Sequence, residues 1–157
     1  MEKKESIYDW WFSKRIEDFP PEELAKRFKV VMELDFWKKI VVLPYIGTEE
    51  VVEYATPELI ALCPATGYPD IYEISIRYAP GGKIPELKSL KFYLMSFKDV
   101  PISHEHLASK IFDEFVQVVE PAERHDGMNY RTACLLTLKV AIRGGIATTI
   151  TKGWLPW

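Results

Sequence analysis

Apolar and polar residues alternate most regularly between Asp70 and Ala79. One side of an extended chain would carry Tyr72, Ile74, Ile76 and Tyr78, and the other the mostly polar set Ile71, Glu73, Ser75 and Arg77. Because successive side chains of a strand point to opposite faces, this period of two predicts a half-buried β-strand. The following Pro80-Gly81-Gly82 predicts its end.

The apolar period becomes helical after residue 85. Spacings of three and four predict a helix over 85–97, with an apolar face of Leu87, Leu90, Leu94 and Phe97. A second helix is predicted from about Ser103 to Val119, with the Ser103 side chain capping its first turn. Its inner face is expected to carry Leu107, Ile111, Phe115 and Val118.

Three more extended segments are predicted around these helices. Residues 51–63 read as extended with an interruption at Pro57, and strands are expected over 130–142 and 146–151. A polar connection over 120–129 precedes the last two, and Arg143-Gly144-Gly145 is expected to form a turn or bulge between them. The order strand, strand, helix, helix, strand, strand predicts an α+β fold: an antiparallel four-stranded sheet with both helices on one face.

Residues 1–50 form a separate first block. Pro20-Pro21-Glu22-Glu23 is typical of a helix start, because proline fits the first turn and acidic residues favour the positive end of the helix dipole. The apolar spacing that follows predicts an amphipathic helix over 24–40, and the run 41–43 stops at Pro44. We therefore expect an N-terminal extension over 1–50, packed on the domain or on a neighbouring subunit, and a main domain over 51–157.

Composition narrows the class of protein. The chain has 157 residues, of which 48% are hydrophobic and 27% charged, as in an ordinary globular domain. Its net charge of −3 does not favour nucleic-acid binding. The polar N-terminus does not read as a signal peptide, and no apolar run approaches the roughly 18 residues of a membrane span.

The cysteine count points to a reducing compartment. Cys63 and Cys134 make neither a disulfide framework nor a four-cysteine zinc pattern, so a cytoplasmic location is expected. Cys63 together with His104-Glu105-His106 also falls short of three or four converging ligands, so no metal site is expected.

A cysteine and an aspartate flank a turn in Leu62-Cys63-Pro64-Ala65-Thr66-Gly67-Tyr68-Pro69-Asp70. The thiolate is the reactive form of cysteine, so a nucleophilic Cys63 needs a neighbouring group that accepts its proton. Asp70, across the turn, is placed to accept that proton and to return it to an atom that becomes negative when sulfur attacks. The alternative is that Cys63 is a small buried hydrophobe and that Asp70 caps the turn.

Three other segments carry charged residues suited to ligand binding. Lys88 and Lys91 share a face at the start of a predicted helix, where two ammonium groups suit a phosphate, although a solvated helix face is the alternative. Glu105 could accept two parallel hydrogen bonds from a guanine-type ring edge, or simply suit the helix dipole. Arg143 could bind a phosphate, or Arg143-Gly144-Gly145 could be a plain hairpin turn.

In combination, these segments resemble the single-module NADPH-dependent nitrile reductases that convert 7-cyano-7-deazaguanine to 7-aminomethyl-7-deazaguanine in queuosine biosynthesis. The resemblance runs from about Val52 to Trp154. It rests on the Cys63–Asp70 segment, on His104-Glu105, on Arg143-Gly144-Gly145 and on Glu86-Leu87-Lys88-Ser89-Leu90-Lys91-Phe92-Tyr93, which matches the family signature. Each piece is weak alone, and the combination is specific.

The resemblance implies the tunnelling fold, in which the sheets of neighbouring subunits join into rings around a tunnel and two rings stack. It thus implies a homo-oligomer, expected to be a decamer, with sites between subunits and no direct contact with nucleic acid or membrane. Three features depart from the family: Ser103 stands where phenylalanine is more common, the connection over 120–129 is longer than in the short members, and residues 1–50 match poorly.

The resemblance also implies a role for each matching residue. Cys63 would attack the nitrile carbon to give a covalent thioimide, Asp70 would manage the protons, and His104 would lie over the ring or the nitrile. The substrate site would consist of Pro85, Glu86, Leu87, His104 and Glu105. NADPH would meet Lys88, Lys91, Arg143 and Gly144 on an oligomeric surface, since the chain has no glycine-rich dinucleotide fingerprint.

Three alternatives use these residues differently. An archaeal relative adds ammonia to the same nitrile within tRNA through the same thioimide, but it lacks the lysine-bearing signature, so Lys88 and Lys91 favour the reductase. A tunnelling-fold module that only binds a purine-like ligand would not need Cys63 and Asp70. A thiol-dependent nitrile hydrolase would release an acid and consume no NADPH.

Overall fold

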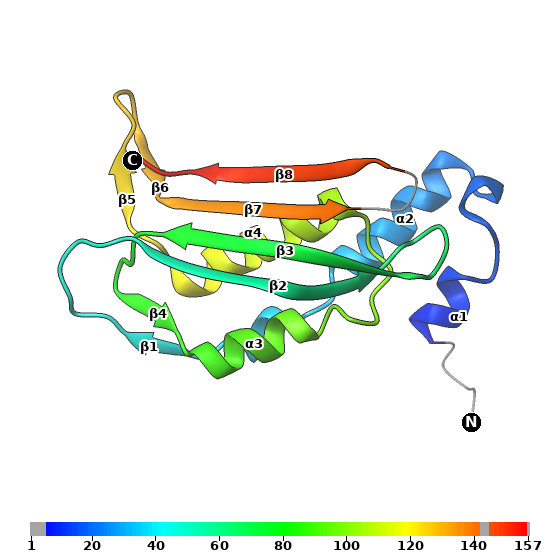
Figure 1. Ribbon diagram of the computed structural model, residues 1–157, viewed down its shortest axis with the longest axis horizontal. Coiled ribbons are helices and arrows are strands. Elements are labelled where there is room, and N and C mark those ends of the chain that lie inside the picture. Colours follow the sequence, from blue (N-terminus) through cyan, green and yellow to red (C-terminus); the bar gives the residue numbers. More distant parts are fainter. Residues whose placement is uncertain (1–5, 142–144, 157) are drawn as a thin grey trace.

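The computed structural model describes residues 6–141 and 145–156. Its main sheet has the order β2-β3-β7-β8 with every neighbouring pair antiparallel, and Figure 1 shows it face-on with α4 behind it. The four strands are β2 (Val52–Leu62), β3 (Pro69–Tyr78), β7 (Cys134–Ala141) and β8 (Ala147–Trp154). Two helices, α3 (Leu87–Met95) and α4 (His104–Val119), lie between β3 and β7 in the chain. The predicted element order and four-stranded sheet are therefore confirmed.

The hydrophobic core lies between one face of this sheet and the helices. The four residues predicted for the inner face of β3 are all buried, and β7 adds Leu136 and Leu138. From α4, Leu107, Ile111 and Phe115 are fully buried, as their spacing predicts. At the end of α4, Val119 is the fully buried residue, and Val118 only packs against the edge of the core. The alternating pattern thus predicted correctly which face of β3 is buried.

One predicted strand has the expected irregularity, and another predicted strand is divided in two by its backbone partners. Strand β2 changes register between Thr56 and Leu59, around the expected interruption at Pro57. The segment expected as one strand over 130–142 breaks at Ala133, whose N–H donates to the carbonyl of Ala122 and whose carbonyl accepts from Ala79. The residues before the break form β6 (Tyr130–Thr132), which pairs in a hairpin with β5 (Glu123–His125), a strand inside the expected polar connection.

The main helix of the N-terminal block ends earlier than predicted. Helix α2 (Pro21–Met32) ends eight residues before the expected end at Ile40, and Trp37–Lys39 form a separate 3₁₀ turn. The cause is tertiary, because the buried Lys110 side chain donates to the carbonyls of Met32 and Leu34 (2.7 Å each). After this turn, β1 (Val42–Pro44) pairs with β4 (Lys83–Pro85).

A short helix, α1 (Ile7–Trp11), and a 3₁₀ turn at Ile16–Asp18 precede α2. Trp11, Val31 and Ile40 belong to the same buried cluster as the sheet residues. In the part of the chain that the structure describes, no helix is both long enough and apolar enough to cross a membrane.

Candidate functional site

Cys63 begins a closed turn between β2 and β3. Its N–H donates to the carbonyl of Tyr68, and its carbonyl accepts from the N–H of Gly67 (2.8 Å each). Gly67 has a φ of +73°, a conformation that glycine adopts without steric cost. Cys63 is half-buried, whereas Cys134 is fully buried in the core, where burial raises the pKa of its thiol to about 12. Of the two thiols, Cys63 is therefore the one that a reagent or substrate can reach.

The start of α4 lies beside this turn because the segment before it hydrogen-bonds to the end of β2. The N–H of Leu62 donates to the carbonyl of Val100 (2.9 Å), and the carbonyl of Leu62 accepts from the N–H of Ile102 (3.1 Å). Ser103 then caps α4 as predicted, accepting from the N–H of His106 (3.4 Å). Helix α4 consequently begins two residues after Ile102, whose N–H binds the residue before Cys63.

Tyr72 connects the predicted residues at this end of the sheet. Its hydroxyl is hydrogen-bonded to Nδ1 of His104 (2.7 Å). Burial raises the pKa of Tyr72, and the negative charges of Asp70, Cys63 and Glu105 raise it further, in that order. Electrostatic shifts of this kind come from charges close to the titrating group. His104 therefore contacts the Tyr72 hydroxyl directly, and Asp70, Cys63 and Glu105 act on it electrostatically.

Sequence reasoning assigned Tyr72 only to the hydrophobic face of its strand and missed this contact. The signal was present, since Tyr72 follows Asp70 by two residues and so shares its face of β3. Asp70 is itself 3% exposed and is the first buried residue of that row.

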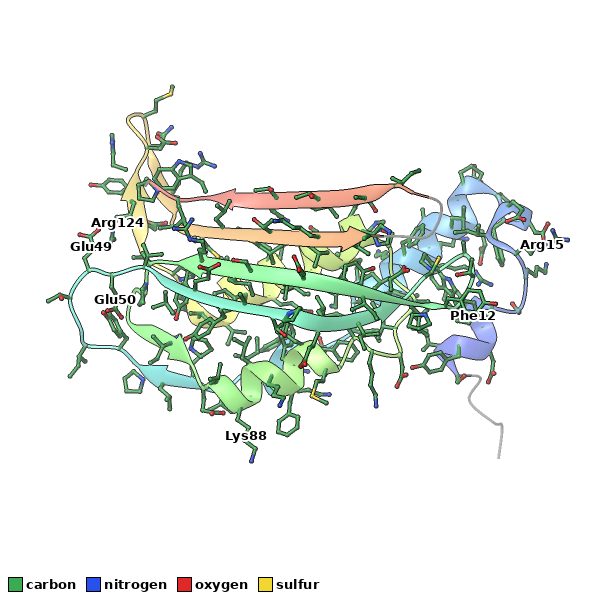
Figure 2. All side chains as sticks on the ribbon, viewed as in Figure 1. Phe12, Arg15, Glu49, Glu50, Lys88 and Arg124 are labelled. Carbon is green, nitrogen blue, oxygen red and sulfur yellow. The ribbon has the colours of Figure 1, made fainter. Side chains whose placement is uncertain are left out.

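The remaining predicted residues lie at the start of α3. Both carboxylate oxygens of Glu86 accept backbone hydrogen bonds, one from Lys88 and one from Ser89 (2.8 Å each), which holds the pKa of Glu86 below its ordinary value. Pro85 ends β4 opposite Val42 and is buried. Leu87, Lys88 and Lys91 are exposed, and Figure 2 shows Lys88 pointing outward from α3. This group thus combines a helix N-cap with exposed cations.

A groove of about 1170 Å³ runs between α3 and strands β2 and β3. Its lining is mostly apolar and includes four of the predicted site residues, namely Glu86, Leu87, Lys88 and Lys91. Cys63, Asp70, His104 and Glu105 are not part of that lining. Figure 2 shows Lys88 well apart from Phe12, whose ring lies against Gly67 of the Cys63 turn. Within one chain, the predicted site therefore falls into two groups.

Arg143 and Gly144, both predicted to meet a cofactor, lie outside the described residues. Among residues 6–141 and 145–156, no three His, Cys, Asp or Glu side chains come together as a metal site would require.

The comparisons with known proteins agree with this fold. The family model of the QueF-like proteins matches residues 69–153, from the start of β3 almost to the end of β8. The chain belongs to the QueF-like family. The matched span contains Asp70, both predicted glutamates, His104 and the α3 lysines, and it begins six residues after Cys63.

Several relatives of this QueF-like chain are named NADPH-dependent 7-cyano-7-deazaguanine reductase. That of Caldicellulosiruptor bescii is 47% identical over 81 residues, which cover 50% of this chain and 62% of the relative. That of Thermoanaerobacter pseudethanolicus is 34% identical over 72% of this chain and 78% of the relative. That of Syntrophus aciditrophicus is 32% identical over 83% of this chain and 88% of the relative. The first match thus spans less than two thirds of the relative's length, and the other two span more.

A solved structure supports the fold of the QueF-like domain. The crystal structure of the archaeosine synthase QueF-Like in the apo form superimposes with a TM-score of 0.55 at 22% identity, covering 70% of this chain and all of that one. At this identity the likeness concerns the fold alone, and the predicted tunnelling fold is confirmed by it.

Proposed function

We propose that this QueF-like chain reduces the nitrile of 7-cyano-7-deazaguanine to the aminomethyl group with NADPH, a step of queuosine biosynthesis. One observation carries the proposal: a half-buried cysteine lies in a closed turn between β2 and β3, next to the start of β3 where Asp70 pairs with Ala61 and Tyr72 holds His104. A reachable thiol beside a carboxylate is what covalent catalysis at an electrophilic carbon requires. The names of the relatives supply the substrate and the cofactor.

Cys63 supplies the nucleophile in this scheme. Its thiolate adds to the nitrile carbon, so that an S–C bond forms while one C–N π bond breaks and the nitrogen takes a proton from Asp70. The resulting thioimide carbon accepts hydride more readily than the nitrile does. Bound NADPH supplies hydride for both reductions. Cys63 leaves as a thiolate when the S–C bond breaks, and one nitrile consumes two NADPH and two protons in all.

The α3 residues fit a phosphate-bearing cofactor. Lys88 and Lys91 are exposed, lie three residues apart on one helix face and border the groove between α3 and β2. We also assign Arg143 and Gly144 to cofactor binding, as the family resemblance implies. For the substrate, we assign Glu105 and His104 to the guanine-like ring, with Pro85, Glu86 and Leu87 completing its site.

We assign the complete site to the junction of two subunits. Figure 2 shows Lys88 well apart from Phe12, whose ring lies against Gly67 of the Cys63 turn, so a neighbour's α3 would have to supply the cofactor contacts to Cys63. Strands β2 and β8 are the outermost strands of the main sheet, where another subunit's sheet can join. From the family resemblance we further propose a stacked-ring homo-oligomer, a decamer, which acts on the free base in the cytoplasm without nucleic acid or membrane.

The amidine-forming reaction of archaeosine synthesis is the second candidate, because it uses the same thioimide and because the fold resembles that of an archaeosine synthase. The exposed pair Lys88 and Lys91 favours the reductase, since ammonia needs no phosphate-binding cations.

The deciding experiment is intact-mass measurement of the protein with 7-cyano-7-deazaguanine, with and without NADPH. We expect a covalent adduct on the wild type and on Cys134→Ala, and none on Cys63→Ala, because only the turn thiol is reachable. NADPH should discharge the adduct and be oxidised at two per nitrile. A protein that oxidises no NADPH at any substrate concentration is not this reductase, and a Cys63→Ala variant that still turns over excludes the thioimide.

A further inference from the structure

The N-terminal block contacts the Cys63 turn directly. The indole Nε1 of Trp11 donates to the carbonyl of Pro64, the residue after Cys63, at 2.7 Å. Trp11 is 3% exposed and Pro64 is half-buried, so this hydrogen bond is partly shielded from water. The next residue, Phe12, lies against Gly67 on the same turn, where a Cβ atom would come within 3.2 Å of its ring. Two consecutive residues of the N-terminal block therefore pack on the turn that carries the thiol.

A buried arginine on α2 holds this segment in place. Nη1 of Arg27 donates to the carbonyl of Trp11 (2.9 Å), and its guanidinium lies 3.8 Å from the centre of the Phe19 ring and 4.3 Å from that of Trp10. Cation–π contacts of a desolvated guanidinium are among the stronger ones. Arg27 therefore fixes the end of α1 against α2, and with it the indole that reaches Pro64.

The same helix contacts the other side of the site. Phe28, next to Arg27, stacks on His106 with ring centres 4.7 Å apart and an angle of 13° between the planes, and it also packs on Trp11. His106 follows His104 by two residues in the first turn of α4 and is hydrogen-bonded to Ser103 (2.6 Å). Figure 1 shows α1 and α2 at the end of the sheet where the β2–β3 turn lies. The N-terminal block thus contacts both the thiol turn and the start of α4.

We propose that α1 and α2 form a clamp that holds the Cys63 turn against the first turn of α4, with Trp11 as the positioning residue for the thiol. The role of the clamp in catalysis rests on the function proposed above, whereas its effect on the reactivity of the Cys63 thiol does not. The clamp gives residues 7–32 of the N-terminal extension a role, since they pack on their own domain beside the site. Trp11 touches no reacting atom and acts only through Pro64.

Trp11→Phe tests the clamp, because it keeps an aromatic ring and removes the N–H donor. Loss of one hydrogen bond should loosen the turn, so we expect iodoacetamide to alkylate Cys63 about fivefold faster, and the nitrile adduct to form about fivefold more slowly. These opposite changes distinguish positioning from simple destabilisation. The Michaelis constant for NADPH should stay unchanged, because the α3 lysines lie outside the clamp. Trp37→Phe is the matched control, since its indole lies outside α1 and α2 and contacts Lys38 and not the turn.

Cys134 reports on the fold in the same experiment, because it is fully buried and labels only when the core opens. If Trp11→Phe does not fold, Phe12→Ala replaces it, since Phe12 is half-buried and lies on the same turn. Cys63 alkylation that matches the wild type in the folded variants overturns the clamp, and so does parallel labelling of Cys134. The alkylation needs no substrate, so it decides the clamp even if the nitrile chemistry fails.

Discussion

The Tyr72 hydroxyl determines how His104 can act. Burial and the neighbouring negative charges raise the pKa of Tyr72, so its hydroxyl stays protonated and can donate to Nδ1 of His104. A neutral imidazole that accepts at Nδ1 carries its proton on Nε2. We therefore expect His104 to present an N–H donor, from Nε2, on the side away from Tyr72.

Tyr72→Phe should remove the preference of the His104 proton for Nε2, with little change in packing. We expect the two tautomers of His104 to become mixed and kcat to fall between about twofold and tenfold, the range for one lost hydrogen bond. Nitrogen NMR of labelled histidine reports the tautomer directly, without substrate. Tyr54→Phe is the control, because that ring stacks on Tyr78 away from His104. A His104 spectrum unchanged by Tyr72→Phe would show that the hydroxyl does not set the tautomer.

The charged residues at the start of helix α3 serve two purposes: Glu86 caps the helix, and Lys88 and Lys91 are exposed. Its N-cap is filled by Glu86, whose carboxylate binds the first free N–H groups of the helix. Lys88 and Lys91 point outward from the next turn, and the buried side of the helix is formed by Ser89, Leu90 and Tyr93. The cap thus stabilises the helix, while the exposed face stays available for a ligand.

Replacing both lysines by alanine should affect NADPH alone. We expect the Michaelis constant for NADPH to rise by roughly 10- to 100-fold, as for lost hydrogen bonds to a charged group, with adduct formation on Cys63 unchanged. Steady-state kinetics and intact mass measure the two effects separately. Lys29→Ala on α2, also an exposed lysine, should change neither. An adduct lost together with NADPH affinity would place Lys88 and Lys91 in the nitrile site.

Three parts of the molecule meet at one buried ion pair. Lys110 of α4 is 3% exposed, pairs with Glu114 one turn later and donates to the carbonyls at the end of α2. The second oxygen of Glu114 accepts from the hydroxyl of Tyr93 on α3 (2.7 Å). This network joins the N-terminal block to both helices. Because its groups are buried, the loss of one member leaves the others without a hydrogen-bond partner.

Lys110→Met should therefore be strongly destabilising. It leaves a buried carboxylate without its cation and two carbonyls without their donor, so we expect a loss of about 3–5 kcal/mol in the free energy of unfolding. Lys152→Met is the surface control, because Lys152 pairs with Asp113 in a more exposed ion pair. There we expect the free energy of unfolding to fall by about 1 kcal/mol or less. Denaturant unfolding measures both. Similar losses in the two variants would mean that the buried pair does not hold the block.

The sequence by itself determined the features that depend on near neighbours in the chain. The alternation along β3 identified its buried face, Ser103 marked the start of α4, and Pro57 marked the irregularity in β2. The motif residues identified the family before any coordinates, because that combination of cysteine, aspartate, lysine and histidine positions is specific.

Only the tertiary structure decided the features that depend on distant partners. Met32 ends α2 because Lys110, far along the chain, binds its carbonyl, and Ala133 breaks a strand because Ala79 and Ala122 take its backbone groups. The contact between Tyr72 and His104, and the separation of Cys63 from Lys88, likewise follow from how strands and helices pack. Local periodicity specifies what an element is, whereas its ends and its neighbours depend on hydrogen-bond partners that the chain supplies only once it has folded.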